Sequence, residues 1–367
     1  MPIQIEEKPC AEGLLGILTL DEPASINALS ETMIDELQAA LDRWANDDRV
    51  CLVLLQGEGE RGFCAGGNIR NLYDALTGSG DPAAPLRFFS KEYRLDHTLH
   101  RFPKPLVGWA HGAVMGGGLG LLSACRYRLV TPDLIMAMPE ISIGLFPDVG
   151  ASWFLNRLPE GLGLFLGLTG ARLNASDALR VGLADLPVYP QQREALVDAI
   201  VATRWTGEVA ADDNRLYRLL NRMETPPHHD LPDSNLARHE QTIARICREG
   251  DLVAIVDRLV AEESRDPWWQ GCISNLTNGC PMTAWLVHEQ LERGRQLSLG
   301  DIFRMELVIA AHCVSQADLA EGIRARLIDK DQSPSWRHGH IRDVTADEVD
   351  AFFHPPWDEQ DDPLIAL

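Results

Sequence analysis

The sequence lacks the long hydrophobic stretches and the leader that would place a protein in or across a membrane. Its 367 residues contain no apolar run near the roughly 18 uninterrupted residues that a membrane-spanning helix needs. The opening stretch "MPIQIEEKPC" is acidic where a secretion signal has a basic and then an apolar start. With 45% hydrophobic and 24% charged residues, we expect a soluble globular protein in the cytoplasm.

Basic residues are also scarce. Thirty-three Lys and Arg stand against 54 Asp and Glu, which gives a net charge of −21. A charge of this sign repels nucleic acid and anionic membranes at long range. We therefore expect neither as a partner, and any polyanionic ligand must be held by local groups.

Several motifs of common enzyme classes are missing. The eight cysteines form no CxxC pair, a pattern typical of reduced, buried thiols rather than disulfides or zinc. His338, His340 and His354 have no suitably spaced carboxylate or cysteine, so we expect no metal. The glycine cluster at 112–120 has Leu121 where GxGxxG needs glycine, and neither GK[ST] nor GxSxG occurs. Dinucleotide binding, a phosphate loop and an α/β-hydrolase serine are thereby disfavoured.

The first half of the chain has an α/β pattern. Residues 13–20 and 50–57 predict strands, and the second run is apolar throughout, as in sheets that are covered on both faces. Between them, residues 30–44 place apolar side chains at helical spacing behind Ser30, a suitable helix cap. Further strands are predicted within 104–112, 126–132 and 134–140. Strands that alternate with helices favour a repeated parallel α/β layout.

The second half is mainly helical by the same criteria. Amphipathic patterns occupy residues 193–205, 234–250 and 301–314. The acidic segment 354–363 is expected to have no fixed structure. We divide the chain into a catalytic core, 1–204, and a helical C-terminal region, 205–367.

Two glycine turns and two acids carry the functional argument. "FCAGGNIR" (63–70) follows a strand, and "GAVMGGGLG" (112–120) precedes a helix. Glycines alone permit tight turns, but amides at a helix start can also stabilise the negative charge that develops on an oxygen. Glu140 and Asp148 lie eight residues apart across a turn at Gly144 and Pro147. Two acids in one poorly solvated pocket would have pKa values pushed apart, so that one keeps a proton.

These motifs, with "MPEISIGLFPDVG", resemble the enoyl-CoA hydratase/isomerase (crotonase) superfamily in order and spacing. The likeness covers nearly the whole chain and is weakest between residues 206 and 279. Three further stretches resemble the branch that hydrolyses 3-hydroxyisobutyryl-CoA: "FFSKEYRLDH", "PEISIGLFPDVGASWFLNRL" and "ADLAEGIRARLIDKDQSPSW". The resemblance implies a crotonase-like spiral of ββα turns with a mainly helical C-terminal region.

The resemblance also implies a site. The amides of Gly67 and Gly117 would form an oxyanion hole for the thioester oxygen of an acyl-CoA. Glu92 aligns with an acid that contacts the substrate. The backbone around four residues would line the groove for the adenine and pantetheine of CoA: Ala28, Ala65, Gly66 and Ile69.

The two acids separate the branches of the superfamily. Hydratases use two glutamates, but the first of these positions is Gly120 here, while the second is kept as Glu140. Asp148 stands where hydratases commonly have glycine. The hydrolase branch resembles this chain in having an aspartate at that position. Glu140 would be the nucleophile on the thioester or the base that activates water. Asp148 would orient the 3-hydroxyl group or relay a proton to the thiolate.

The expected function is hydrolysis of 3-hydroxyisobutyryl-CoA or a similar short 3-hydroxyacyl-CoA, with a role in valine degradation implied by the resemblance. One alternative is an enoyl-CoA hydratase or isomerase that uses Glu140 as its base. Another is a noncatalytic acyl-CoA-binding protein. Asn68, where the hydrolases usually have Asp, leaves acyl-chain preference open. No cofactor is expected beyond the CoA of the substrate, and assembly into a homo-oligomer is left open.

Overall fold

The computed structural model describes residues 2–223, 225–248 and 250–367. By their internal contacts these residues form two compact units, each built from three stretches of chain. Unit 1 comprises Met1–Gly67, Leu95–Met136 and Leu173–Ser234, and unit 2 comprises Asn68–Arg94, Ala137–Arg172 and Asn235–Leu367. The predicted boundary between residues 204 and 205 stays a prediction.

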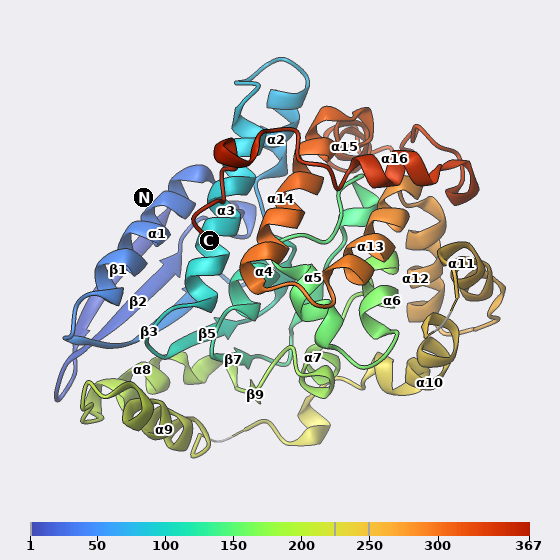
Figure 1. The fold of residues 1–367 in the computed structure, drawn as a ribbon. Helices are drawn as coiled ribbons and strands as arrows, with labels where there is room; N and C mark the ends of the chain where they lie inside the picture. Colours follow the sequence, from blue (N-terminus) through green and yellow to red (C-terminus); the bar gives the residue numbers. More distant parts are fainter. Residues whose placement is uncertain (1, 224, 249) are drawn as a thin grey trace. The chain divides into compact units, whose positions relative to one another are not determined.

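Unit 1 is built on a six-stranded sheet with the order β1-β2-β3-β5-β7-β9 (Figure 1). Strands β2 to β9 of this sheet pair in parallel, and β1 adds an antiparallel edge. The parallel layout predicted for the first half is therefore confirmed. The strands are β1 (Ile3–Pro9), β2 (Leu14–Leu20), β3 (Val50–Gly57), β5 (Leu106–Ala110), β7 (Tyr127–Val130) and β9 (Leu186–Pro187).

Helices cover both faces of this sheet, because side chains of a strand point alternately to its two sides. Leu15 and Ile17 of β2 belong to the core formed with α8 (Arg193–Ala202) and α9 (Val209–Leu220). Between them Gly16 lies against the indole of Trp44 on α1 (Glu31–Ala45). As predicted, the Ser30 hydroxyl caps α1, accepting from the amide of Met33. The helices α4 (Gly117–Ser123) and α7 (Ala175–Val181) also belong to unit 1.

A second, three-stranded sheet has the order β4-β6-β8. Its strands are only three residues long: β4 (Gly62–Cys64), β6 (Ala113–Met115) and β8 (Ile135–Ala137). β4 and β6 pair in parallel and lead directly into the two glycine turns. This small sheet thus brings two loops together that are about fifty residues apart in the chain.

Unit 2 is almost entirely helical. The buried helix α6 packs against α10, α12 and α13. The long helix α3 (Ala84–His100) begins in unit 2 and ends in unit 1. Besides α3, the helices of unit 2 are α2 (Ile69–Leu76), α5 (Ala151–Phe154), α6 (Leu162–Thr169), α10 (Asn235–Cys247), α11 (Leu252–Ala261), α12 (Pro267–Asn278), α13 (Pro281–Gly294), α14 (Leu299–Ser315), α15 (Ala317–Ile323) and α16 (Ala346–Ala351). The helical C-terminal region expected from the sequence is confirmed.

The C-terminal segment contradicts the sequence-based expectation. Residues 354–363 were predicted to lack fixed structure, but they include a turn of 3₁₀-helix at Glu359–Asp361. Beyond them Leu364 is fully buried, and the guanidinium of Arg304 donates to its carbonyl and to that of Leu367. The buried leucine and these hydrogen bonds offset the ordering cost that the acidic composition suggested would prevail.

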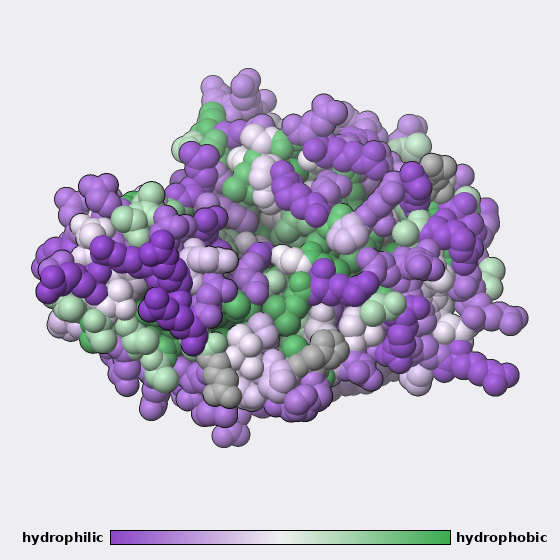
Figure 2. Space-filling view, turned by 90° about the horizontal axis from the view of Figure 1, so that it is seen from below, coloured by the Kyte–Doolittle hydropathy of each residue, from purple (hydrophilic) through white to green (hydrophobic). Residues whose placement is uncertain are grey.

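Hydrophilic residues cover most of the face shown in Figure 2, and hydrophobic ones occupy smaller areas there. No helix among the described residues is both long and apolar enough to cross a bilayer. All eight cysteines are free thiols, as predicted, and only Cys10 among them is not buried.

Candidate active site

The first glycine turn follows β4 directly in unit 1. Gly66 has φ +92°, a conformation that side chains rarely adopt, and its carbonyl accepts from the amide of Leu29. Leu29 and Gly67 form an isolated parallel bridge. The turn therefore leaves the strand sharply and is held by the segment before α1.

The second glycine turn follows β6 and begins α4. Gly116 has φ +47°, and Gly117 is the first residue of the helix. The two turns lie against each other, since a Cβ placed on Gly66 would come 2.9 Å from the carbonyl oxygen of Met115 and 3.3 Å from the Gly117 nitrogen. Gly118 likewise lies against the Cys64 carbonyl. Only glycine fits at these close backbone approaches.

The amides of Gly67 and Gly117 both belong to this pair of turns. Within the described part of the chain, neither nitrogen donates to another protein atom. For Gly117 this follows from its place at a helix start, where the first N–H groups have no intrahelical acceptor. Both amides are thus open to an acceptor from outside the protein.

Three of the four predicted groove residues belong to unit 1 and the fourth belongs to unit 2. Ala28 and Ala65 are half-buried in unit 1, beside Gly66. Ile69 begins α2 in unit 2, behind Asn68, whose side chain caps that helix. The sequence did not single out Asn27, which is fully buried and whose amide group donates to the carbonyls of Gly62 and Phe63. Asn27 fixes the backbone at Ala28 to β4.

The predicted acids lie together in unit 2. Glu140 starts a 3₁₀ turn after β8, Asp148 lies on the following loop, and Glu92 lies on α3. All three are buried, with exposed fractions of 5%, 4% and 2%. Glu92, which could have been a solvated acid of a charged helix, is therefore not one. The charge of Asp148 raises the pKa of Glu92 and of Glu140, so both glutamates lie near it.

Burial is the main cause of altered pKa values in this cluster. Desolvation raises the pKa of Asp148 to about 6, although a hydrogen bond from Tyr93 opposes this rise. Desolvation, and next the charge of Asp148, raise the pKa values of Glu140 and Glu92 well above the ordinary range. The hydroxyl of Tyr93 stabilises the ionised form of Asp148.

Two participants in this cluster were missed by sequence reasoning. The Tyr93 hydroxyl, fully buried, donates to Oδ2 of Asp148 at 2.7 Å. Glu306 on α14 is fully buried too, and the charge of Asp148 contributes to its raised pKa of about 8, after desolvation. Tyr93 is adjacent to Glu92 and could have been suspected, whereas Glu306 lies more than 150 residues from Asp148 with no motif around it.

The hydrogen bonds of the acids are incomplete. Among the residues that the structure describes, Oε2 of Glu140 and Oε1 of Glu92 have no hydrogen-bond partner. A buried, unpartnered carboxyl oxygen costs free energy of about 1–3 kcal/mol. Such groups are typical of sites that await a ligand.

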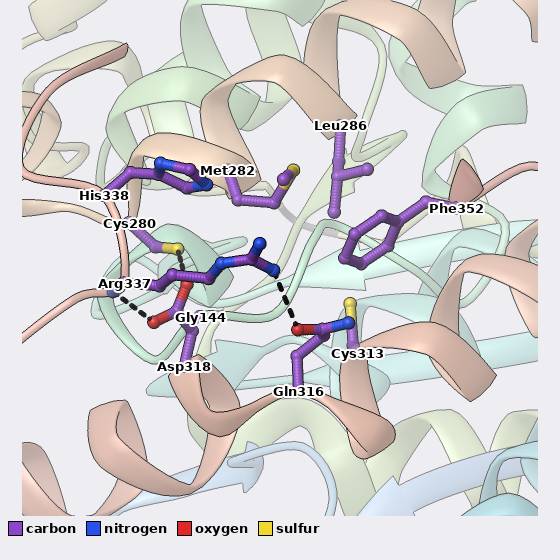
Figure 3. Close-up of a pocket in the computed structure, with 10 residues that line it drawn as sticks. All are labelled: Gly144, Cys280, Met282, Leu286, Cys313, Gln316, Asp318, Arg337, His338 and Phe352. Carbon is purple, nitrogen blue, oxygen red and sulfur yellow. Dashed lines mark hydrogen bonds between the residues drawn. The ribbon is translucent and has the colours of Figure 1, made fainter. Parts of the chain in front are cut away.

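A small cavity lies beside Gly144, which precedes the acid loop (Figure 3). Its volume of about 20 Å³ has room for one water molecule. The Cys280 thiol and the Arg337 amide both donate to the carboxylate of Asp318 at its wall. His338 lines this cavity, and its side chain is 13% exposed.

A larger cavity of about 330 Å³ lies between α6, α11 and α13, all within unit 2. Neither of these two cavities is lined by Glu140, Asp148 or Glu92. In the described ranges no group of three or more His, Cys, Asp or Glu side chains is arranged to hold a metal ion. The chemistry must therefore be sought in the acids and the amide turns.

These features define a class of protein. Two open amides on adjoining glycine turns can stabilise an oxyanion, and a buried acid cluster can act as base, nucleophile or proton donor. Each of these two kinds of group is used in the activation of a carbonyl group. On a fold of two sheets and many helices, they are the groups of an acyl-thioester enzyme of the crotonase type.

Comparison with known proteins shows the family. The sequence model described as Enoyl-CoA hydratase/isomerase matches residues 15–353. The chain therefore belongs to the enoyl-CoA hydratase/isomerase family, and the fold predicted from the sequence is confirmed.

Curated relatives carry a more specific name. The chain is 36% identical to the mitochondrial 3-hydroxyisobutyryl-CoA hydrolase of Danio rerio over 351 residues, which cover 95% of this chain and 89% of that protein. It is 32% identical to the human protein of the same name, covering 96% and 88%. Because these relatives are mitochondrial, the cytoplasmic location inferred from the sequence is contradicted and is withdrawn.

Two solved structures are similar over nearly their full length. One is a carnitinyl-CoA dehydratase from Mycobacterium thermoresistibile, with a TM-score of 0.84, 33% identity and 96% coverage of both chains. The other is an enoyl-CoA hydratase from Rhodobacter sphaeroides, with a TM-score of 0.83 and 34% identity, covering 97% of this chain and 98% of that one. Their names describe water addition or removal, which differs from thioester hydrolysis.

Proposed function

We propose that the protein is an acyl-CoA thioester hydrolase that releases CoA from 3-hydroxyisobutyryl-CoA or a similar short 3-hydroxyacyl-CoA. The observation that carries the proposal is Asp148, buried next to Glu140 and hydrogen-bonded to Tyr93. The resemblance implies an aspartate at this position in the hydrolase branch, and the curated relatives are named hydrolases. The role in valine degradation, implied by the resemblance, belongs to the same proposal.

The thioester oxygen would accept hydrogen bonds from the amides of Gly67 and Gly117. These donors stabilise the negative charge that the oxygen gains when the carbonyl carbon is attacked. Removing one such donor typically costs about 10²–10³ in kcat. The backbone near Ala28, Ala65, Gly66 and Ile69 would hold the CoA portion.

In its ionised form, Glu140 would begin the reaction by one of two routes. As a nucleophile, its carboxylate forms a bond to the carbonyl carbon, the C–S bond breaks, and water then hydrolyses the mixed anhydride. As a base, it takes a proton from water, whose oxygen attacks the same carbon. In either route the departing thiolate takes up a proton and leaves as CoA.

Asp148 and Glu92 would act on the acyl portion. Asp148, whose ionised form is stabilised by the Tyr93 hydroxyl, is suited to accept a hydrogen bond from the 3-hydroxyl group or to relay the proton to sulfur. Glu92, with an open carboxyl oxygen, would contact the substrate too. No cofactor is needed, because a carboxylate, water and two amides suffice for hydrolysis.

The names of the two solved structures favour one rival, an enoyl-CoA hydratase or isomerase with Glu140 as its base. Hydratases of the family rely on a second glutamate, and Gly120 occupies that position here. The rival therefore needs a single acid to do the work of two. A noncatalytic acyl-CoA-binding protein, the third candidate, would bind without turnover.

The test is an acyl-CoA panel assayed for free thiol. We expect wild-type protein to release CoA from 3-hydroxyisobutyryl-CoA and 3-hydroxypropionyl-CoA. Glu140→Gln should lower kcat by about 10²–10⁴, the usual contribution of a general acid or base. Asp148→Gly should abolish hydrolysis while thermal melting shows that the chain remains folded.

Hydration of crotonyl-CoA without thiol release would overturn the hydrolase proposal in favour of the rival. Binding of acyl-CoA in calorimetry, unchanged by Glu140→Gln and without turnover, would favour the binding protein. Light scattering with size-exclusion chromatography tests the homo-oligomer, which stays a prediction.

A further inference from the structure

The loop that carries Asp148 is held from one side by three buried polar side chains of the C-terminal helices. On α13, the hydroxyl of Thr283 donates to the carbonyl of Leu145 at 2.9 Å, and Nε2 of Gln290 donates to that of Pro147 at 2.8 Å. On α14, Glu306 accepts from two amides of the same loop. Thr283, Gln290 and Glu306 are all at most 1% exposed.

Glu306 makes two of these contacts, and Thr283 and Gln290 make one each. Its Oε2 accepts from the Gly150 amide at 2.7 Å, and its Oε1 accepts from the Ser152 amide at 2.9 Å. Both oxygens are therefore used, and the two amides begin α5, which has only four residues.

The backbone between Asp148 and these amides is strained. Val149 has φ +55°, which a β-branched residue rarely adopts, and Gly150 follows with φ +83°. Such a conformation persists only where its surroundings enforce it. The two hydrogen bonds to Glu306 come from backbone amides that follow closely after Val149. They are therefore placed to enforce its strained conformation.

We propose that Glu306 is a positioning residue that holds the Val149–Gly150 turn in its left-handed conformation and thereby fixes Asp148 for the reaction. It acts through the loop, since its own oxygens are occupied by the two amides. The inference rests on the proposed function, because it assigns Glu306 to the same acid site. It also gives the C-terminal helices a part in catalysis that the sequence did not suggest.

The test is Glu306→Gln, which keeps the shape of the side chain. The side-chain nitrogen of glutamine cannot accept a hydrogen bond, so one of the two backbone amides, Gly150 or Ser152, loses its acceptor. We expect kcat for thiol release to fall by about 100-fold, as for other misplacements of about 1 Å, with a smaller change in KM. Glu306→Asp, which keeps the carboxyl group and both acceptor oxygens but shortens the side chain, should retain more activity than Glu306→Gln.

A matched control exists in unit 1. Asp212 is 1% exposed and likewise accepts from two loop amides, those of Thr206 and Gly207, both at 2.8 Å. Asp212→Asn should lower the melting temperature about as much as Glu306→Gln and leave kcat within about twofold. An equal loss of kcat in both variants would show that Glu306 contributes only to folding.

A double-mutant cycle decides whether Glu306 acts through Asp148. If it does, Glu306→Gln combined with Asp148→Asn should lose no more activity than Asp148→Asn alone. If the fold-losses of kcat of the two single variants multiply in the double variant, the proposal is overturned.

Amide hydrogen exchange separates this inference from the proposed function. In wild-type protein the amides of Gly150 and Ser152 should be protected, and Glu306→Gln should raise their exchange at least about tenfold, the ratio that corresponds to 1.4 kcal/mol. Unchanged exchange overturns the positioning role whatever the activity is. A wild type that exchanges as expected but releases no thiol overturns the hydrolase function and not the hold on the loop.

Discussion

Glu140 and Asp148 are buried to the same degree, but their surroundings differ. Asp148 accepts a hydrogen bond from Tyr93 at 2.7 Å, whereas Oε2 of Glu140 finds no partner among the described residues. The hydroxyl stabilises the ionised form of Asp148 and limits the rise of its pKa to about 6. The Tyr93 hydroxyl thus distinguishes the surroundings of the two acids, and the separation of their pKa values stays a prediction.

Tyr93→Phe should therefore shift the pH dependence of activity. A carboxylate with a pKa of about 6 is ionised above that pH, so activity that needs ionised Asp148 falls as the pH drops below about 6. Without the Tyr93 donor the pKa of Asp148 rises further, and we expect the acid-side fall of kcat/KM to move to higher pH. At pH 6 the variant should lose about tenfold in kcat/KM, and at pH 9 clearly less.

The control for this variant is Tyr127→Phe. Tyr127 donates to Oδ1 of Asp213 at 2.9 Å in unit 1, so it loses the same kind of bond. Its pH profile should match that of the wild type. A Tyr93→Phe profile that is lower by one factor at every pH would contradict the role assigned to the hydroxyl.

At the scale of elements, two turns after very short strands place the oxyanion donors. The conformation of Gly66 and its contact with the Met115–Gly117 backbone are what bring the two turns together. Gly66→Ala would introduce a Cβ that overlaps with the Met115 carbonyl. We expect kcat to fall by about 10²–10³, as when an oxyanion donor is displaced, in the thiol-release assay.

Gly182→Ala serves as the comparison. Gly182 also has positive φ, +77°, but a Cβ there would meet no atom within 4 Å. Both variants bear the backbone cost of alanine in a left-handed conformation, about 1–2 kcal/mol. Only Gly66→Ala should lose activity beyond that cost. If both lose kcat alike, general destabilisation explains the result.

The elements also show how far sequence patterns reach. Strands β2, β3, β5, β7 and β8 were predicted from the apolar runs that contain them. β4 and β6, with three residues each, are too short for any period, so only the glycines beside them could be noticed. The edge strand β1 was not predicted, since its charged residues Glu6, Glu7 and Lys8 are solvated on an outer strand.

At the scale of the whole molecule, the net charge of −21 should oppose the approach of a CoA thioester, whose phosphates are anionic. Raising the ionic strength from about 10 mM to about 150 mM shortens the screening length from roughly 30 Å to roughly 8 Å. We expect KM for the acyl-CoA to fall at least about twofold, with kcat unchanged. Initial rates at several salt concentrations measure this.

An uncharged thioester of N-acetylcysteamine with the same acyl group is the control substrate. Its KM should not depend on salt, because it carries no phosphate for the protein to repel. A KM for acyl-CoA that rises with salt would show instead that local cationic side chains outweigh the net charge.

The sequence by itself determined the family, the parallel α/β core, the helical C-terminal region and the candidate acids, because strand and helix periods and motif spacing are local properties of the chain. Only the tertiary structure decided which groups surround those acids. Tyr93 lies 55 positions along the chain from Asp148, and Glu306 lies 156 positions from Gly150, yet both bind the same loop. Burial rather than sequence spacing is the main cause of the raised pKa of Asp148. Desolvation and long-range hydrogen bonds depend on how the helices pack, and no local pattern encodes that.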